Sequence, residues 1–226
     1  GAGGGYKMKI AFTNYNRAET LTNFPALVVF SNNMAGTTFS FGTFLSTNGN
    51  DLRFWNDAET TNLNYEIDTW STGATSYVWV QVPSFTNNCY IWATWGDSAR
   101  TNQPVYTTNG ATWSAGYSNV WHYKEPSGVV GDSTFNKNSC TLTGTTVRDS
   151  SGLTGGSCWF NGTNGYAYSA ASVSGPNTFT ISTFFKTTTG SGGKLVGLGS
   201  PQTGQATSYD HHIYMINAGN IYAGVY

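Results

Sequence analysis

Hydrophobic and polar side chains alternate along residues 6–13, with Tyr6, Met8, Ile10 and Phe12 at every second position. Successive side chains of an extended strand point to opposite faces, so this alternation predicts a half-buried β-strand. Other runs rich in β-branched and aromatic residues predict further strands, because such side chains suit a pleated sheet. In the first half of the chain these runs are residues 24–30, 51–55, 77–82 and 88–95.

Residues 101–117 lose this alternation and are rich in Asn, Thr, Gln, Pro, Gly and Ser, which predicts a connector. Strand-like runs resume beyond it, at residues 119–123, 157–161, 166–170, 178–186, 194–199, 213–217 and 221–226. No stretch keeps a helical period, although one short turn is expected within residues 34–45. The pattern predicts an all-β protein of two antiparallel β-sandwich or jelly-roll domains, residues 1–110 and 111–226.

Composition narrows the classes of function. Charged residues make up only 9% of the 226 residues, and the net charge is -1 with Lys and Arg scattered, so no basic stripe exists for nucleic acid. No run approaches the roughly 18 apolar residues of a membrane span, so no membrane insertion is expected. A surface solvated mainly by hydroxyl and amide groups suits a secreted or cell-surface location.

Three cysteines are present, and none lies in a C-x-x-C motif. Cys140 and Cys158 are the candidate disulfide pair, with two free thiols as the alternative. Cys89 lies inside an apolar strand pattern, where a thiol fills core space. Asn161 begins the sequence Asn-Gly-Thr, a candidate N-glycosylation site.

Several motifs of the first half resemble, in order and spacing, a family of secreted prokaryotic proteins known as domain of unknown function 2341. The resemblance covers about residues 5–100. Its motifs are Tyr6–Ile10, Leu21–Pro25, Asn50–Phe54, Leu63–Trp70, Val78–Pro83 and Ile91–Asp97.

A laminin-G-like or concanavalin A-like domain often follows in that family, and the second half carries similar segments. These are Val120–Glu125, Asp132–Asn136, Phe160–Tyr166 and Phe179–Lys186. The resemblance implies two β-sandwiches on a large surface protein, with adhesion or glycan binding as the expected role and no established chemistry. The second domain has fewer strand-like runs than a complete module of that type, so it is expected to be incomplete.

Glu66 and Asp68 raise the question of an enzyme, because concanavalin-like glycoside hydrolases present paired carboxylates on one strand. Alternation places both on one face. Retaining hydrolysis needs two carboxyl groups about 5 Å apart, and the position that would supply the missing partner is Trp70. A solvated strand face is therefore expected here, and no catalytic residue is nominated.

The resemblance also suggests calcium, which many laminin-G-like modules hold near the segment that contains Glu125, Asp132 and Asn136. Calcium takes six or more oxygens, and these three residues lack the spacing of a dedicated calcium loop, so ordinary turn-forming roles are the alternative. No cofactor is required. Asp210, His211 and His212 are expected in an exposed loop rather than in a metal site. His122 is expected to be a hydrogen-bonded histidine of the core or its rim.

Aromatic side chains on a sandwich surface can stack on sugar rings while amides bind hydroxyls. The candidate glycan-binding residues are Trp113, Tyr117, Tyr166 and Tyr168. The sequence thus favours a non-catalytic surface protein for adhesion, carbohydrate binding or cell-surface structure, with glycans or neighbouring subunits as partners. The alternatives are a homo-oligomer or filament assembled by strand complementation, and a glycoside hydrolase.

Overall fold

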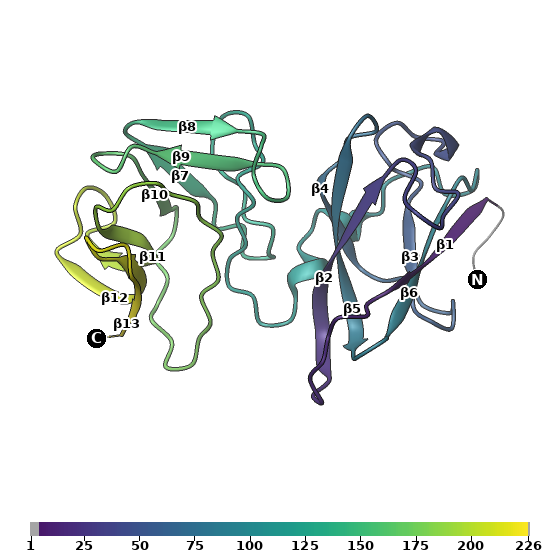
Figure 1. Cartoon of the computed structure of the whole chain (residues 1–226), viewed down its shortest axis with the longest axis horizontal. Helices are drawn as coiled ribbons and strands as arrows, with labels where there is room; N and C mark the ends of the chain where they lie inside the picture. The colour runs from purple at the N-terminus through teal and green to yellow at the C-terminus, as the bar shows by residue number, and fades with distance from the viewer. Residues whose placement is uncertain (1–4, 226) are drawn as a thin grey trace.

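The computed structural model describes residues 5–225, in which strands and three short 3-10 turns are connected by loops, without an α-helix (Figure 1). The strands of the first half are β1 (Tyr6–Ala11), β2 (Leu21–Ser31), β3 (Arg53–Trp55), β4 (Tyr65–Thr69), β5 (Thr75–Phe85) and β6 (Tyr90–Trp95). Those of the second half are β7 (Cys140–Thr143), β8 (Thr146–Asp149), β9 (Ser157–Phe160), β10 (Tyr166–Ser169), β11 (Gly193–Ser200), β12 (Ser208–Met215) and β13 (Ile221–Gly224). The prediction of an all-β protein is confirmed.

Two antiparallel three-stranded sheets, β1-β6-β3 and β2-β5-β4, build the first half and contribute to one core. Alternate residues of each strand point inward. Those of β5 are Val78, Val80 and Val82, which are at most 3% exposed. Each such side chain contributes about 1.5–3 kcal/mol when it leaves water. The Tyr65 hydroxyl donates to the carbonyl of Leu52 at 2.6 Å, which satisfies the one polar atom of a fully buried ring.

The outward positions of β5, Tyr77, Trp79 and Gln81, belong to the opposite face of the β2-β5-β4 sheet. The connector packs on this face through two 3-10 turns, η2 (Val105–Thr107) and η3 (Ala111–Trp113). Gln81 Nε2 donates to the carbonyl of Thr112 at 3.2 Å and to Ser114 Oγ at 2.9 Å. The connector is therefore part of the folded first half.

The second half contains the sheets β10-β7, β8-β9 and β11-β12-β13, all antiparallel. Its buried apolar residues are few, namely Val130, Cys140 and Met215. Two glycines mark where this half approaches the first. A Cβ on Gly110, whose φ is +104°, would lie 2.4 Å from Phe135 N, and one on Gly155 would lie 1.9 Å from Thr69 Oγ1. At Gly110 two backbone segments meet too closely for a side chain, and at Gly155 the Thr69 side chain occupies the space that a Cβ would need.

Two predicted strands are wrong. Residues 119–123 make only an isolated bridge between Trp121 and Asp132, and residues 178–186 pair with no strand. Two short strands, β7 and β8, had no separate prediction, and β4 was expected only as the strand that carries Glu66 and Asp68. The turn expected within residues 34–45 is present as the 3-10 turn η1 (Phe41–Thr43). Strand-like composition in the second half was thus a weaker guide than in the first, because pairing partners decide which runs become strands.

Candidate functional site

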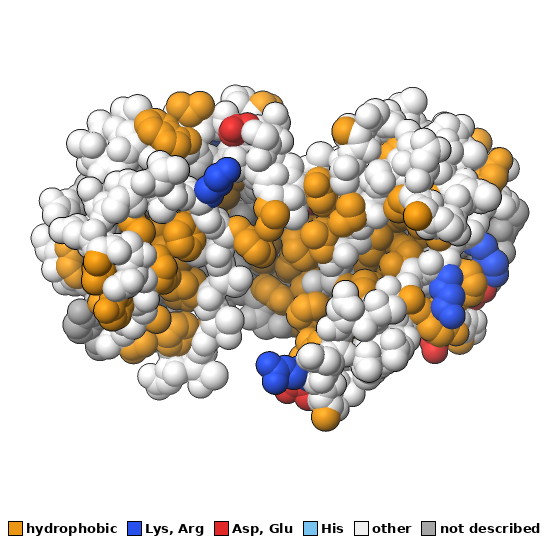
Figure 2. All heavy atoms as spheres, in the orientation of Figure 1, with side chains coloured by type: hydrophobic (Ala, Val, Ile, Leu, Met, Phe, Trp, Pro, Cys, Tyr) orange, Lys and Arg blue, Asp and Glu red, His pale blue; other side chains and the backbone are white. Residues whose placement is uncertain are grey.

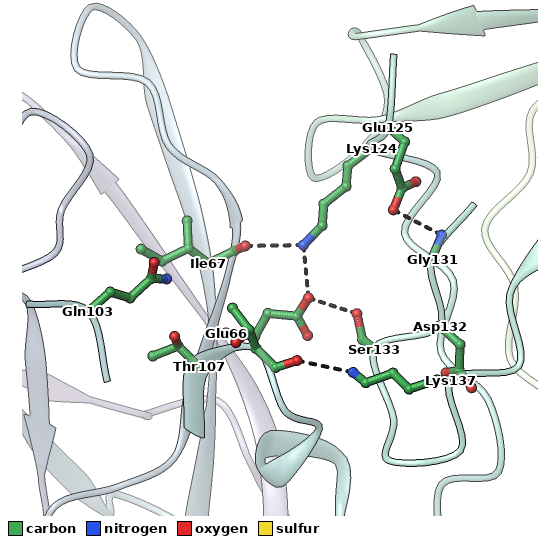
Figure 3. Close-up of a pocket in the computed structure, with 11 residues that line it drawn as sticks. Glu66, Ile67, Gln103, Thr107, Lys124, Glu125, Gly131, Asp132, Ser133 and Lys137 are labelled. Atoms are coloured by element: carbon green, nitrogen blue, oxygen red, sulfur yellow. Dashed lines mark hydrogen bonds and ion pairs between the residues drawn. The ribbon is translucent and has the colours of Figure 1, made fainter. Parts of the chain in front are cut away.

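The carboxylate of Glu66, on β4, lies where the two halves of the chain meet (Figure 3). Lys124 Nζ and Ser133 Oγ, both from the second half, donate to its Oε1 at 2.8 and 2.7 Å. Trp113 Nε1, from the connector, donates to its Oε2 at 2.6 Å. Because Glu66 is only 9% exposed, these charge-assisted hydrogen bonds are little weakened by water. One carboxylate therefore joins three parts of the chain.

Asp68, on the same strand, forms the second part of this cluster with His122. His122 Nδ1 lies 3.3 Å from Asp68 Oδ2, and its Nε2 lies 3.7 Å from Glu66 Oε2. Trp79 Nε1 donates to the same Asp68 oxygen at 3.1 Å. The imidazole packs against the rings of Trp79 and Trp113, with centroids 6.0 and 5.5 Å away. His122 is partly buried, with a side chain that is 8% exposed, which fits the expected core or rim position, and it faces two carboxylates.

These surroundings hold Glu66 in its ionised form. Burial raises the pKa of its carboxyl group, but His122 and Lys124 lower it by more, to about 2. The 3.7 Å between His122 Nε2 and Glu66 Oε2 is longer than a hydrogen bond, whereas Lys124 Nζ is at 2.8 Å. The ammonium group of Lys124 is therefore the neighbour on which the low pKa mainly depends.

The prediction that Glu66 and Asp68 lie on a solvated strand face is wrong, since they are 9% and 6% exposed. The sequence correctly places them on one side of their strand, but the connector and the second half cover that side. Trp70, which stands where a hydrolase motif would have its third carboxylate, donates its indole N–H to the carbonyl of Thr47 at 3.0 Å. No sequence signal pairs β4 with Lys124, because the two are 58 residues apart.

A cavity of about 230 Å³ lies next to Glu66, between the halves (Figure 3). It is lined by Glu66, Ile67, Gln103, Thr107, Thr108, Lys124, Glu125, Gly131, Asp132, Ser133 and Lys137. Asp68 and His122 are not part of this lining. The volume is below the roughly 300–1,000 Å³ usual for drug-sized ligands, so the cavity has room for water or one small polar molecule.

Each of the three calcium candidates is engaged in hydrogen bonds within the protein. Asp132 accepts two hydrogen bonds on Oδ1 and three on Oδ2, from Val120, Thr134, Asn119 and Asn138. A carboxylate has about four lone-pair positions, so these donors occupy Asp132 fully in the turn that it organises. Glu125 Oε1 accepts from Gly131 N at 2.9 Å, and Asn136 Nδ2 donates to the carbonyl of Ser118 at 2.8 Å.

Within residues 5–225, no group of three or more His, Cys, Asp and Glu side chains is arranged to hold a metal ion. The calcium hypothesis stays a prediction. His211 and His212 are 7% and 8% exposed, so the expectation of an exposed loop is wrong for them. They lie on β12, and His211 Nδ1 is 2.6 Å from Asp210 Oδ2.

One of the four glycan-binding candidates is misplaced. Trp113 is 5% exposed, and its indole N–H donates to Glu66, so it offers no stacking surface. Tyr117 is 39% exposed and makes an edge contact with Trp113 at 5.2 Å. Tyr166 and Tyr168 share one face of β10, with ring centroids 6.0 Å apart, and both are partly buried.

An exposed aromatic residue that the sequence did not single out is Trp159 on β9, at 55% exposure. Its cross-strand partner on β8 is Val147, which is also 55% exposed. A tryptophan so open to water is unusual, because its large ring is mostly buried in folded proteins. The sequence signal that could have found it is the alternation along β9, which places Trp159 on the face opposite to Cys158 and Phe160.

The remaining candidates are the cysteines and the sequon. Cys89, Cys140 and Cys158 are free thiols in this structure, so the Cys140–Cys158 bridge is not formed. Asn161 Oδ1 accepts from the backbone N–H groups of residues 163, 164 and 165, and its Nδ2 donates to Asn164 Oδ1 at 2.8 Å. The amide that a glycan would modify is thus engaged in a turn.

One part of this site lies in a segment that matches a known protein family. No curated protein and no solved structure matches the chain. Among residues 5–225 there is no helix of the length and hydrophobicity needed to cross a membrane. Residues 48–114 match a family model described as a domain of unknown function (DUF2341). This segment includes Glu66, Asp68, Trp79 and Trp113, so the carboxylate side of the junction lies in a region similar to that family.

Proposed function

We propose that this protein is a non-catalytic extracellular surface protein, built from two β-sandwich domains, that adheres to carbohydrate. The observation that carries the proposal is the exposed ring of Trp159 on the outer face of β8 and β9. Sugar rings present apolar C–H faces that stack on such a ring, and this contact needs no basic charge. The scarcity of charged residues, visible in Figure 2, agrees with a neutral ligand.

The surroundings of Trp159 supply polar groups as well as the ring. Asp149 lies next to Val147 along the outward side of β8, and Ser157 is its cross-strand partner on β9. These oxygens stand beside the ring on the same face, where they can bind sugar hydroxyls. Figure 2 shows hydrophobic side chains gathered at the upper left, where β8 and β9 lie in Figure 1.

The state of Glu66 supports the absence of catalysis. A general acid for glycoside hydrolysis needs a raised pKa, whereas the pKa of Glu66 is lowered to about 2. Three donors hold its two oxygens, and the neighbouring Asp68 is enclosed by Trp79 and His122. The alternative is a glycoside hydrolase that uses Glu66 and Asp68. Release of reducing sugars from polysaccharides incubated with the protein would reveal this activity.

The test of carbohydrate binding is replacement of Trp159 by Ala. We expect loss of at least tenfold in affinity for a polysaccharide identified on a glycan array, measured by isothermal titration calorimetry, since stacking on one ring contributes about 0.5–1.5 kcal/mol beyond the buried area. Phe184→Ala is the matched control, because Phe184 is 78% exposed and outside this face. Equal affinity of Trp159→Ala and the wild type, or an array without any binding, would refute the proposal.

A second candidate function is a subunit of an extracellular homo-oligomer or filament. It is favoured by residues 171–191, which form no strand although residues 178–186 have a strand-like composition. Phe184 and Phe185 in this segment are 78% and 47% exposed. An extended apolar segment can add to the open edge of a sheet in a second copy of the chain.

Light scattering after size exclusion tests assembly. If the filament proposal holds, the wild type forms concentration-dependent oligomers, and Phe184→Ser shifts them to monomer. Leu45→Ser provides the control, since Leu45 is also exposed, at 55%, but lies in the first half. A wild-type monomer at every concentration, with no fibres in negative stain, would exclude this second function and leave the carbohydrate proposal untouched.

A further inference from the structure

The strand β2 forms an unpaired edge of the first half. It is the outer strand of the β2-β5-β4 sheet, and within residues 5–225 it pairs with β5 alone. Its eleven residues carry no charge. Natural proteins often protect exposed edges with charged residues, and the edge strand β1 carries Lys7 and Lys9. Apart from Pro25, which removes one donor from the ladder, the edge of β2 is open to another strand.

A groove lined by aromatic side chains lies beside the start of β2. Its volume is about 470 Å³, and its lining includes the rings of Phe12, Tyr15, Phe24 and Phe85. Phe24 belongs to β2 and has the same orientation along the strand as the buried Val28. The first three rings surround that of Phe85, with centroids 5.0–5.4 Å from it. The groove thus opens part of the aromatic core to the surface around β2, where Figure 2 shows hydrophobic side chains.

Residues 178–186 provide a strand-like segment without a strand partner. In this structure they form no strand, yet Phe179, Ile181 and Phe185 share one face if the segment is extended. Phe179 and Phe185 are 38% and 47% exposed. In its own chain the segment is held by a contact between the rings of Phe179 and His211, whose centroids are 4.2 Å apart. Pairing with another copy has to replace this contact.

Length decides which edge can receive this segment. Its nine residues need an edge strand of at least that length, and β2 has eleven. The next longest edge strand in the described part of the chain is β11, with eight residues. We propose that residues 178–186 of one copy pair with the edge of β2 in a second copy and place Phe185 in the aromatic groove. This inference rests on the proposed assembly of the chain into oligomers or filaments, for which it names the two surfaces that join.

One antiparallel register satisfies both the edge and the groove. The register that places Phe185 opposite Phe24 sets the whole segment against residues 23–31, all within β2. It also places Ile181 opposite the buried Val28, so apolar side chains meet across the new pair. Antiparallel pairing is slightly more stable per residue than parallel pairing. The groove volume lies within the range that holds drug-sized ligands, so a phenylalanine ring has room there.

Light scattering after size exclusion of two variants and of their mixture tests the proposal. Val29→Lys puts a charge on the open edge, where Val29 is 46% exposed, and Phe185→Ser removes the inserted ring. We expect each variant to associate at least tenfold more weakly than the wild type. The first keeps an intact donor segment and the second an intact β2, so their equimolar mixture should form a dimer that neither forms alone. Val147→Lys, at an equally open valine of the edge strand β8, is the control and should associate like the wild type.

Hydrogen–deuterium exchange of the wild type locates the joining surfaces without any substitution. Amides of residues 21–31 and 178–186 should exchange more slowly in the assembled protein than in the dilute protein, whereas those of residues 193–200 should not change. If Val29→Lys does not fold by circular dichroism, this measurement decides, and protection of another edge in place of residues 21–31 would contradict the proposal.

The outcomes separate this inference from the assembly on which it rests. Oligomers that form equally well in Val29→Lys and Val147→Lys, or a mixture of the two variants that forms no dimer, would overturn the pairing with β2 and leave assembly itself intact. A wild type that is monomeric at every concentration would refute assembly, and the inference with it.

Discussion

Replacing Glu66 by Gln should lower the free energy of unfolding by about 3 kcal/mol, the usual cost of removing one partner of a buried ion pair. The amide keeps the shape but removes the charge, so Lys124 loses its ion pair at 2.8 Å. The new NH2 group also faces a donor, either Lys124 and Ser133 or the Trp113 indole. Urea unfolding followed by circular dichroism measures the change.

Glu59→Gln is the matched control. Glu59 also accepts from a lysine at 2.8 Å, Lys7, but the Lys7 side chain is 50% exposed. Exposed ion pairs contribute about 0–1 kcal/mol, so this variant should unfold close to the wild type. If Glu66→Gln and Glu59→Gln had the same small effect, the junction carboxylate would not have the stabilising role assigned to it.

Acid should destabilise the wild type through the same residue. The pKa of Glu66 is about 2 in the folded protein against 4.5 for the ordinary side chain, so the unfolded chain takes up a proton first as the pH falls. The stabilisation is therefore complete above about pH 4.5 and is lost progressively down to about pH 2. This pKa difference corresponds to about 3 kcal/mol of stability.

Urea midpoints measured between pH 7 and pH 2 test this dependence. Over this pH range the free energy of unfolding of Glu66→Gln should fall by about 3 kcal/mol less than that of the wild type. The stabilities of the two proteins should converge near pH 2, because the wild-type carboxyl group is then half protonated or more. Parallel curves that keep their separation at pH 2 would contradict the low pKa. The same curves for Glu59→Gln should follow the wild type.

Most strands of the first half could be predicted from the sequence. The alternation around Met8 and Ile10 and the apolar runs of β2 and β5 predicted strands that the structure contains. These runs bury one face of each sheet, so the period of two in the sequence agrees with the burial of alternate side chains in the structure. The short β4 strand was expected only from the alternation of Glu66 and Asp68. Its bulge between Ile67 and Thr69 breaks the regular pairing with β5.

The second half was harder because its strands are short and its core is small. Residues 178–186 have the composition of a central strand, yet composition gives no pairing partner, and the structure leaves them unpaired. The glycan-binding candidate Trp113 is buried, whereas Trp159, which the sequence did not single out, is exposed. Exposure of an aromatic side chain depends on what packs over it, and that is a property of distant segments.

By itself the sequence determined the all-β class, most strands of the first half and the common face of Glu66 and Asp68. Only the tertiary structure decided that this face is buried, because Trp113, His122 and Lys124 approach it from segments more than 45 residues away. Period-2 alternation is local, so it assigns side chains to faces. Whether a face meets water or another part of the chain depends on long-range packing, and at Glu66 that packing turned an expected solvated carboxylate into the buried link between the two halves.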